Sequence, residues 1–178
     1  MTCIIGLVED GKLYMGSDSG AMAGWDKRLR KRSKVFKVGE FTVGYTSSFR
    51  MGQILQFHLN VRAREEGETV DEYIVRGFIE AVRKALKDYG YTKVESNREE
   101  AGEFLLGYQG HLWNVSDDLQ AGENVDGFDA VGCGAPYALA AMKALDGLPP
   151  LARIEKALAI SAYFSNGVSG PFEVGGDL

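Results

Sequence analysis

The chain has 178 residues, of which 45% are hydrophobic and 25% are charged, and its formal net charge is −5. This composition is typical of a soluble protein with one sizeable core, so we expect a single domain over residues 1–178. No apolar run reaches the ~18 residues of a membrane span, and no signal peptide opens the sequence. We therefore expect a cytoplasmic protein with no membrane partner, and the acidic net charge argues against a nucleic-acid partner.

Cysteine and histidine are scarce in this sequence. The residues are Cys3, Cys133, His58 and His111. Two cysteines build neither a disulfide framework nor a zinc site, and the two histidines lie far apart with no ligand pattern near them. We therefore expect no metal, no cofactor and no histidine-based catalytic triad.

The first elements in chain order are strands. Residues 2–8 are continuously apolar, which indicates a strand buried on both faces, and residues 13–18 return after a turn at Asp10-Gly11. A second pair of strands is predicted over residues 34–38 and 41–46. The basic stretch between the two pairs, residues 27–34, is predicted to be a solvated loop or a loop that meets a neighbouring subunit, because no aromatic residues are interleaved for nucleic-acid stacking.

Helices follow these strands. Apolar residues recur at helical spacing from Ser48, and the pattern ends near Gly67. Thr69 and Glu72 form a capping box that opens a second helix, and Gly90 follows its end. Residues 91–102 are polar and are predicted to be a loop.

The second half of the chain repeats the order of strands and then helices. The predicted elements are a hairpin of residues 103–108 and 111–115, a strand over 130–134, helices over 136–145 and 151–164, and a strand near 172–174. Because runs of strands and runs of helices are segregated, the pattern is not that of an alternating βαβ protein. We predict an α+β fold, a four-layer αββα sandwich of two antiparallel sheets with helix pairs outside.

Thr2 is the residue with the clearest catalytic potential, because only Met1 precedes it in the sequence. Removal of Met1 would place a hydroxyl and a free α-amine on the same residue. An α-amine with a reference pKa near ~8 is a usable base at neutral pH, so Thr2 would carry both nucleophile and base. Threonine also follows the start methionine for no catalytic reason, so this hypothesis depends on the rest of the sequence.

The sequence resembles the proteasome β-subunit family of N-terminal nucleophile hydrolases, and among these it is most similar to the bacterial HslV-type threonine peptidases. The resemblance is carried by Thr2–Asp18, by Lys34-Val35 after the basic loop, by Val43–Ser48 before a helix, and by Ala130–Ala141 followed by the Glu155–Leu158 helix. Each segment alone is weakly specific, but together they span nearly the whole chain in the expected order.

The resemblance implies a set of catalytic residues. Thr2 would attack a peptide carbonyl, and the positive charge of Lys34 would favour its ionised hydroxyl and the neutral amine. Asp18 would stabilise Lys34, because a lone buried ammonium is costly. Without the resemblance, Asp18 also fits a turn residue and Lys34 an exposed strand residue.

Further roles follow from the resemblance at two loops. The backbone N–H of Ser48 would hold the oxyanion. Ser169 matches a serine near the terminal amine, and Asn166 stands where an aspartate is expected, which removes a negative charge. Cys133 stands where a serine is usual, and thiols are weaker hydrogen-bond partners. We therefore expect a lower turnover rate than in a site that has the aspartate and the serine.

The leading function from the resemblance is a threonine-type endopeptidase that forms hexameric or heptameric rings, stacked in pairs. Its partners would be copies of itself, peptide or unfolded-protein substrates, and an ATP-dependent unfoldase. The alternative is a catalytically weak or silent subunit of the same fold that serves assembly. A small-substrate amidase of the same superfamily ranks third, because those enzymes more often begin with cysteine or serine.

Overall fold

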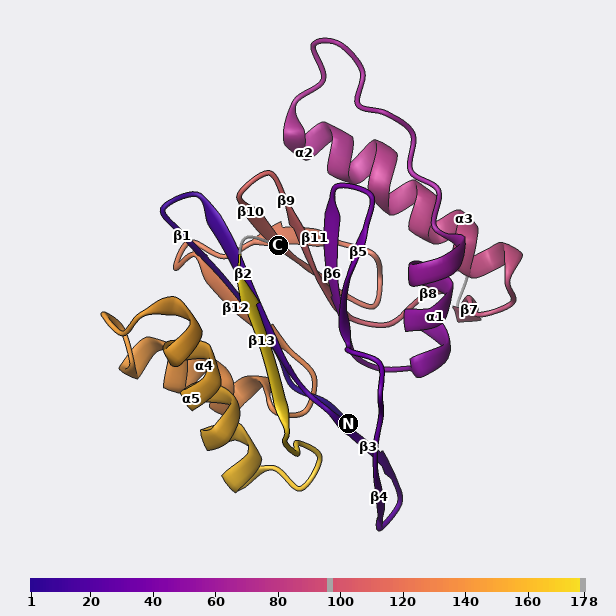
Figure 1. The fold of residues 1–178 in the computed structure, drawn as a ribbon. Helices are drawn as coiled ribbons and strands as arrows, with labels where there is room; N and C mark the ends of the chain where they lie inside the picture. Colours follow the sequence, from indigo (N-terminus) through magenta and orange to yellow (C-terminus); the bar gives the residue numbers. More distant parts are fainter. Residues whose placement is uncertain (96–97, 177–178) are drawn as a thin grey trace.

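The computed structural model describes residues 1–95 and 98–176, and within them two main sheets lie face to face (Figure 1). One sheet runs in the order β12-β1-β2-β13, with every neighbouring pair antiparallel. Its strands are β1 (Ile4–Glu9), β2 (Lys12–Asp18), β12 (Phe128–Val131) and β13 (Phe172–Gly176). Asp10 and Gly11, with φ of 52° and 72°, form the predicted tight turn between β1 and β2.

The other sheet runs in the order β11-β10-β9-β6-β5, again with antiparallel neighbours. Its strands are β5 (Val35–Val38), β6 (Phe41–Tyr45), β9 (Phe104–Tyr108), β10 (His111–Val115) and β11 (Ala121–Glu123). β6 and β9 are buried along their whole length, which explains why their sequences are almost continuously apolar.

Each sheet is covered on its outer face by helices. Helices α4 (Ala135–Ala144) and α5 (Pro150–Phe164) pack on the first sheet through a core that includes Ile5, Ala138 and Leu158. On the second sheet lie α1 (Phe49–His58) and a continuous helical rod of α2 (Val70–Tyr73), the π-helical segment η1 (Ile74–Ile79) and α3 (Glu80–Asp88). Thr69 and Glu72 form the predicted capping box at the start of this rod.

A third core fills the space between the sheets. It is built by Ile4, Leu13, Met15, Leu105, Leu112 and Val131, from strands of both sheets. The layers are therefore helices, sheet, sheet and helices, and the predicted αββα sandwich is confirmed (Figure 1). No helix in the described part of the chain is long and apolar enough to span a membrane.

The first helix is shorter in the structure than the sequence predicts. α1 ends at His58, and Leu59 is already extended, so the expected continuation to Gly67 is wrong. Leu59 and Val61 still pack on the core of the second sheet, and this is why they continue the apolar spacing. The segment is held by other contacts, because Arg62 pairs with Glu68 and its carbonyl accepts a hydrogen bond from the Tyr73 hydroxyl at 2.7 Å.

Two small hairpins stand where loops were expected. The basic stretch begins within β4 (Asp26–Leu29), which pairs with β3 (Gly20–Ala23). The polar stretch contains β7 (Lys93–Glu95) and β8 (Arg98–Glu100), which pair with each other. Every residue of β4 is exposed, so its sequence has no buried alternation to reveal a strand.

The predicted strand over residues 130–134 is also displaced toward the N-terminus. β12 ends at Val131, Gly132 has a φ of 96°, and Cys133 is exposed rather than in a strand.

Candidate active site

Lys34 lies at the centre of a buried polar cluster between the two sheets. Its Nζ donates hydrogen bonds to Thr2 Oγ1 at 2.9 Å, to Asp18 Oδ1 at 2.7 Å and to the Gly20 carbonyl at 2.7 Å. The residue is only 1% exposed, and these three acceptors match the three protons of an ammonium group. Lys34 directly precedes β5, and its carbonyl accepts from the Tyr45 N–H, so the second sheet fixes its position.

Asp18 stabilises this cluster from the last position of β2, where it is completely buried. One carboxylate oxygen accepts from Lys34 Nζ and from the Cys3 N–H at 2.9 Å. The other accepts from the N–H groups of Gly20 at 3.0 Å and Ser169 at 3.3 Å. The carboxylate is thus both ion-paired and hydrogen-bonded to backbone, which is what a buried charge requires.

The electrostatics of Lys34 reflect two opposed effects. Burial lowers the pKa of the Lys34 ammonium from its ordinary value, and the neighbouring Asp18 acts in the opposite direction. The lysine therefore loses its proton more readily than an exposed lysine, and Asp18 limits that change.

Thr2 is buried, with 5% of its surface exposed, and it lies two residues before β1. Hydrogen bonds to the turn after β12 hold its backbone. Its carbonyl accepts from the Gly134 N–H at 3.2 Å, and its N–H donates to Cys133 Sγ at 3.3 Å. A side chain at Gly132 would place a Cβ 2.3 Å from the Thr2 carbonyl oxygen, so only glycine permits this approach. The turn after β12 therefore positions Thr2 in front of Lys34.

The structure describes the full sequence, with Met1 in front of Thr2. The Thr2 hydroxyl donates to the Met1 carbonyl at 2.6 Å, and the Met1 side chain packs against Gly167. The Thr2 nitrogen is therefore an amide and cannot act as a base in this form.

Ser48 lies close to Thr2 but uses its hydrogen-bonding groups locally. Its N–H donates to the Thr46 carbonyl at 2.7 Å, around Ser47 with a φ of 63°. Its side chain accepts from the Arg50 N–H and caps α1. A small pocket of about 100 Å³ separates this turn from Thr2, and Met1, Thr2 and Ser48 all line it.

Ser169 and Asn166, the two predicted site residues in the loop before β13, differ in their distance from the cluster: Ser169 contacts it and Asn166 does not. Ser169 supports the cluster through the bond from its N–H to Asp18, while its hydroxyl donates to the Gly170 carbonyl at 3.2 Å. Asn166 is exposed, and its side chain makes no hydrogen bond to any residue in the described part of the chain. The structure thus brings Thr2, Asp18 and Lys34 together, with Ser169 behind them, and leaves Asn166 outside.

Several contributors are backbone groups that sequence reasoning missed. The Gly20 carbonyl and N–H bind Lys34 and Asp18, and Gly132 allows the approach of Thr2. The glycines around Cys133 were the available signal, because paired glycines often mark a close backbone contact. Within residues 1–95 and 98–176, no group of three or more histidine, cysteine or carboxylate side chains could hold a metal ion.

Comparisons with solved structures identify similar folds. BPH from Thiobacillus denitrificans, solved alone and in complex with epoxomicin, is 22% identical with a TM-score of 0.80, over 98% of this chain and 97% of that chain. The eukaryotic HslV from Trypanosoma brucei is 17% identical with a TM-score of 0.69, over 98% of both chains. No protein-family model and no curated protein matches the sequence.

The two structures match the chain over almost their whole length, although the sequence identity is low. They agree with the layer order and with the resemblance that the four sequence segments indicate. The chain therefore has the fold of the Thiobacillus BPH and of the Trypanosoma HslV.

Proposed function

We propose that the chain is a threonine-type endopeptidase in which Thr2 is the nucleophile once Met1 has been removed. The observation that carries this proposal is the contact of 2.9 Å between Lys34 Nζ and Thr2 Oγ1 inside a buried cluster. A buried cation next to a hydroxyl lowers the cost of ionising that hydroxyl. A structural role alone would not need the ammonium to contact a hydroxyl at the start of the chain.

The proposed reaction begins with attack of Thr2 Oγ on the carbonyl carbon of a peptide bond. The hydroxyl proton passes to the α-amine of Thr2, directly or through a water molecule, and then to the leaving amine as the carbon–nitrogen bond breaks. Water hydrolyses the resulting ester, with the same amine as base. Lys34 stays protonated and stabilises the ionised oxygen, and Asp18 keeps Lys34 charged.

Three further residues have proposed supporting roles. The Ser48 N–H would hold the oxyanion, which requires it to turn away from the Thr46 carbonyl when substrate fills the small pocket. Ser169 would support the site through its bond to Asp18. Asn166 would reach the Thr2 amine only after the loop before β13 moves.

We also propose that the chain acts in the cytoplasm as rings of six or seven copies, stacked in pairs and served by an ATP-dependent unfoldase. The likeness to HslV supports this assembly. Enclosure has a physical purpose, because a peptidase of broad specificity must be separated from folded cellular proteins.

A silent assembly subunit is the second candidate, because the Ser48 N–H already donates to the Thr46 carbonyl and Asn166 lies outside the buried cluster. While Met1 is present, the only free α-amine belongs to Met1, whose side chain lies against Gly167. If native cells leave Met1 in place, the chain has no N-terminal nucleophile.

The test is the intact mass of natively expressed protein before and after treatment with an electrophilic peptide probe. Epoxomicin is the first choice, because the Thiobacillus protein binds it. We expect loss of Met1, one adduct per chain and peptide hydrolysis. Thr2→Ala should abolish the adduct and the hydrolysis but not the loss of Met1. The control Thr92→Ala removes a hydroxyl far from the cluster and should leave the adduct unchanged. A correctly trimmed chain that gives no adduct and no hydrolysis would favour the silent subunit.

A further inference from the structure

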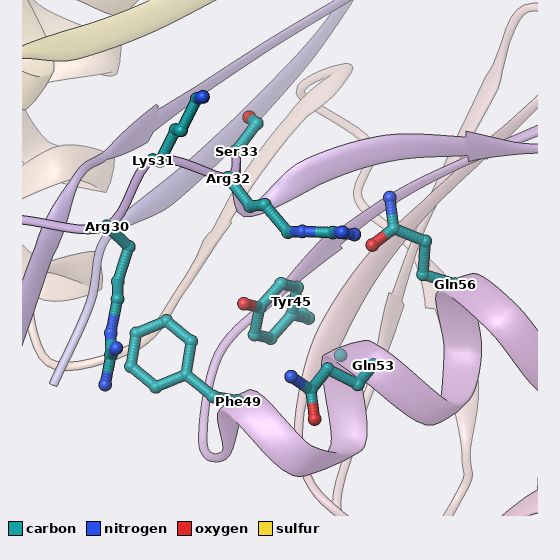
Figure 2. A pocket seen from close by; sticks show the side chains of 9 residues that line it. Arg30, Lys31, Arg32, Ser33, Tyr45, Phe49, Gln53 and Gln56 are labelled. Carbon is teal, nitrogen blue, oxygen red and sulfur yellow. The ribbon is translucent and has the colours of Figure 1, made fainter.

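A second, larger pocket adjoins the small pocket in front of Thr2. It has a volume of about 300 Å³ and shares Tyr45 and Phe49 with the small pocket. The other side chains that shape it come from α1 and from the segment that leads into Lys34 (Figure 2). The larger pocket is therefore connected to Thr2 through the small pocket, which Tyr45, Phe49 and Thr2 all line.

Positive charge dominates the wall of this larger pocket. Arg30, Lys31 and Arg32 line it, and no aspartate or glutamate does among the described residues. None of the three forms an ion pair with a carboxylate in residues 1–95 and 98–176. The chain has a net charge of −5, so this pocket is a local concentration of positive charge in an acidic protein.

Aromatic rings hold two of these cations in place. The guanidinium carbon of Arg30 lies 5.1 Å from the centre of the Phe49 ring, and that of Arg32 lies 5.1 Å from the centre of the Phe57 ring. Stacking on a ring orients the guanidinium group and leaves its N–H donors available at the edge. The two guanidinium groups can therefore donate hydrogen bonds to a bound anion, because no neighbouring carboxylate in the described part of the chain pairs with them.

Tyr45 adds a neutral donor to the same pocket. It is only 8% exposed, yet its hydroxyl has no hydrogen-bond partner among the residues that the structure describes. In Figure 2 this hydroxyl is turned toward the side of the pocket where Arg30 and Phe49 lie. Burial raises the pKa of Tyr45 to about 12, although Arg30 opposes this, so the hydroxyl keeps its proton at neutral pH.

We infer that this pocket receives the carboxylate side chain of the substrate residue whose carbonyl Thr2 attacks, so that the peptidase cleaves after glutamate or aspartate. The inference rests on the proposed function and adds the substrate class to it. Arg30 and Arg32 supply charge-assisted hydrogen bonds, and Tyr45 supplies a neutral one. The residue that contributes the attacked carbonyl lies nearest to Thr2, so its side chain is the one best placed to reach the adjoining pocket.

The experiment compares two fluorogenic peptides that differ only in glutamate or glutamine before the cleaved bond, with the Met1-free protein. We expect kcat/KM to favour glutamate by at least ~10-fold at low ionic strength, and the ratio to shrink as salt screens these exposed cations. Arg32→Gln, Arg30→Gln and Tyr45→Phe should each lower the ratio. Arg28→Gln, on exposed β4 outside the pocket, removes one positive charge of the same basic stretch and should preserve it.

A binding measurement separates this inference from the proposed function. The same two peptides are titrated into two proteins that cannot cleave them, Thr2→Ala and the double variant Thr2→Ala/Arg32→Gln, and binding is followed by NMR. Tighter binding of the glutamate peptide that depends on Arg32 supports the pocket even if no variant hydrolyses anything, in which case the peptidase assignment alone fails. Hydrolysis or binding with equal preference for glutamate and glutamine would overturn the inference.

Discussion

Lys34 is the residue on which the proposed chemistry depends most, because its ammonium joins the Thr2 hydroxyl to the Asp18 carboxylate. A fully buried lysine is costly, and replacing such a pair with apolar residues is often neutral or stabilising. The presence of this pair, with Lys34 directly before β5 and Asp18 at the end of β2, is therefore better explained by reactivity than by stability.

The pH dependence of activity should report on Lys34. The proposed mechanism needs the cation, and burial lowers its pKa below the ordinary 10.5 while Asp18 raises it. As pH rises through this lowered pKa, the charge is lost, so kcat/KM should fall at a pH below that of an ordinary lysine. Asp18→Asn removes the effect that raises the pKa and should move the fall closer to neutral pH.

The measurement is kcat/KM against pH for the unmodified protein, for Asp18→Asn and for the control Asp10→Asn in the exposed turn after β1. The control should reproduce the unmodified profile. An alkaline limb that stays in place in Asp18→Asn would show that the ionisation of Lys34 does not limit activity.

At the scale of elements, the turn between β12 and α4 positions Thr2, the proposed nucleophile. Gly132 has a φ of 96°, and this conformation lets the chain approach the Thr2 carbonyl closely. Gly147, between α4 and α5, also has a positive φ of 83°, but a Cβ there would meet nothing within 4 Å. Comparing substitutions at the two glycines therefore distinguishes the cost of a positive φ from the cost of steric contact with Thr2.

Alanine at these two glycines should therefore have different effects. Gly147→Ala should cost about 1–2 kcal/mol of the free energy of unfolding, because a side chain disfavours positive φ. Gly132→Ala carries the same strain and also displaces Thr2, so it should cost about 3 kcal/mol and slow the reaction with the electrophilic probe at least ~10-fold. Urea unfolding and adduct formation measure the two effects, and equal values for both variants would refute the positioning role of Gly132.

The sequence predicted the elements best where one physical signal was strong. The capping box at Thr69 and the turn at Asp10-Gly11 specify local backbone geometry directly, and both are present. α1 was overextended because Leu59 and Val61 are buried without being helical, and burial alone does not identify a helix. The exposed strand β4 gave no periodic signal at all.

The same distinction applies to the candidate site. Thr2, Asp18 and Lys34 could be placed together from sequence, because the likeness to a known family ordered them and charge pairing required a partner for Lys34. The contribution of Gly20, and the bond from the Ser48 N–H to the Thr46 carbonyl, depend on backbone orientation, which side-chain identity does not encode. The exposed position of Asn166 depends on the path of a loop, and no residue pattern in the sequence fixes it.

At the scale of the whole molecule, both outer layers are helical and the candidate site lies between the sheets, near the hairpin of β3 and β4 (Figure 1). Native mass spectrometry of the Met1-free protein should show twelve or fourteen copies, the number expected for paired rings of six or seven. A strictly monomeric protein at micromolar concentration would contradict the assembly, and it would leave the chemistry at Thr2 to be judged separately.

The most direct test of the central claim is to locate the covalent bond that an electrophilic peptide probe forms. Proteolytic fragments of treated protein are sequenced by mass spectrometry. The account predicts a single modified fragment that begins at Thr2, with the probe on Thr2 itself, and no modified fragment in Lys34→Ala within the same reaction time. A probe bound instead to the exposed Cys133 beside Thr2, or to a chain that still carries Met1, would contradict it.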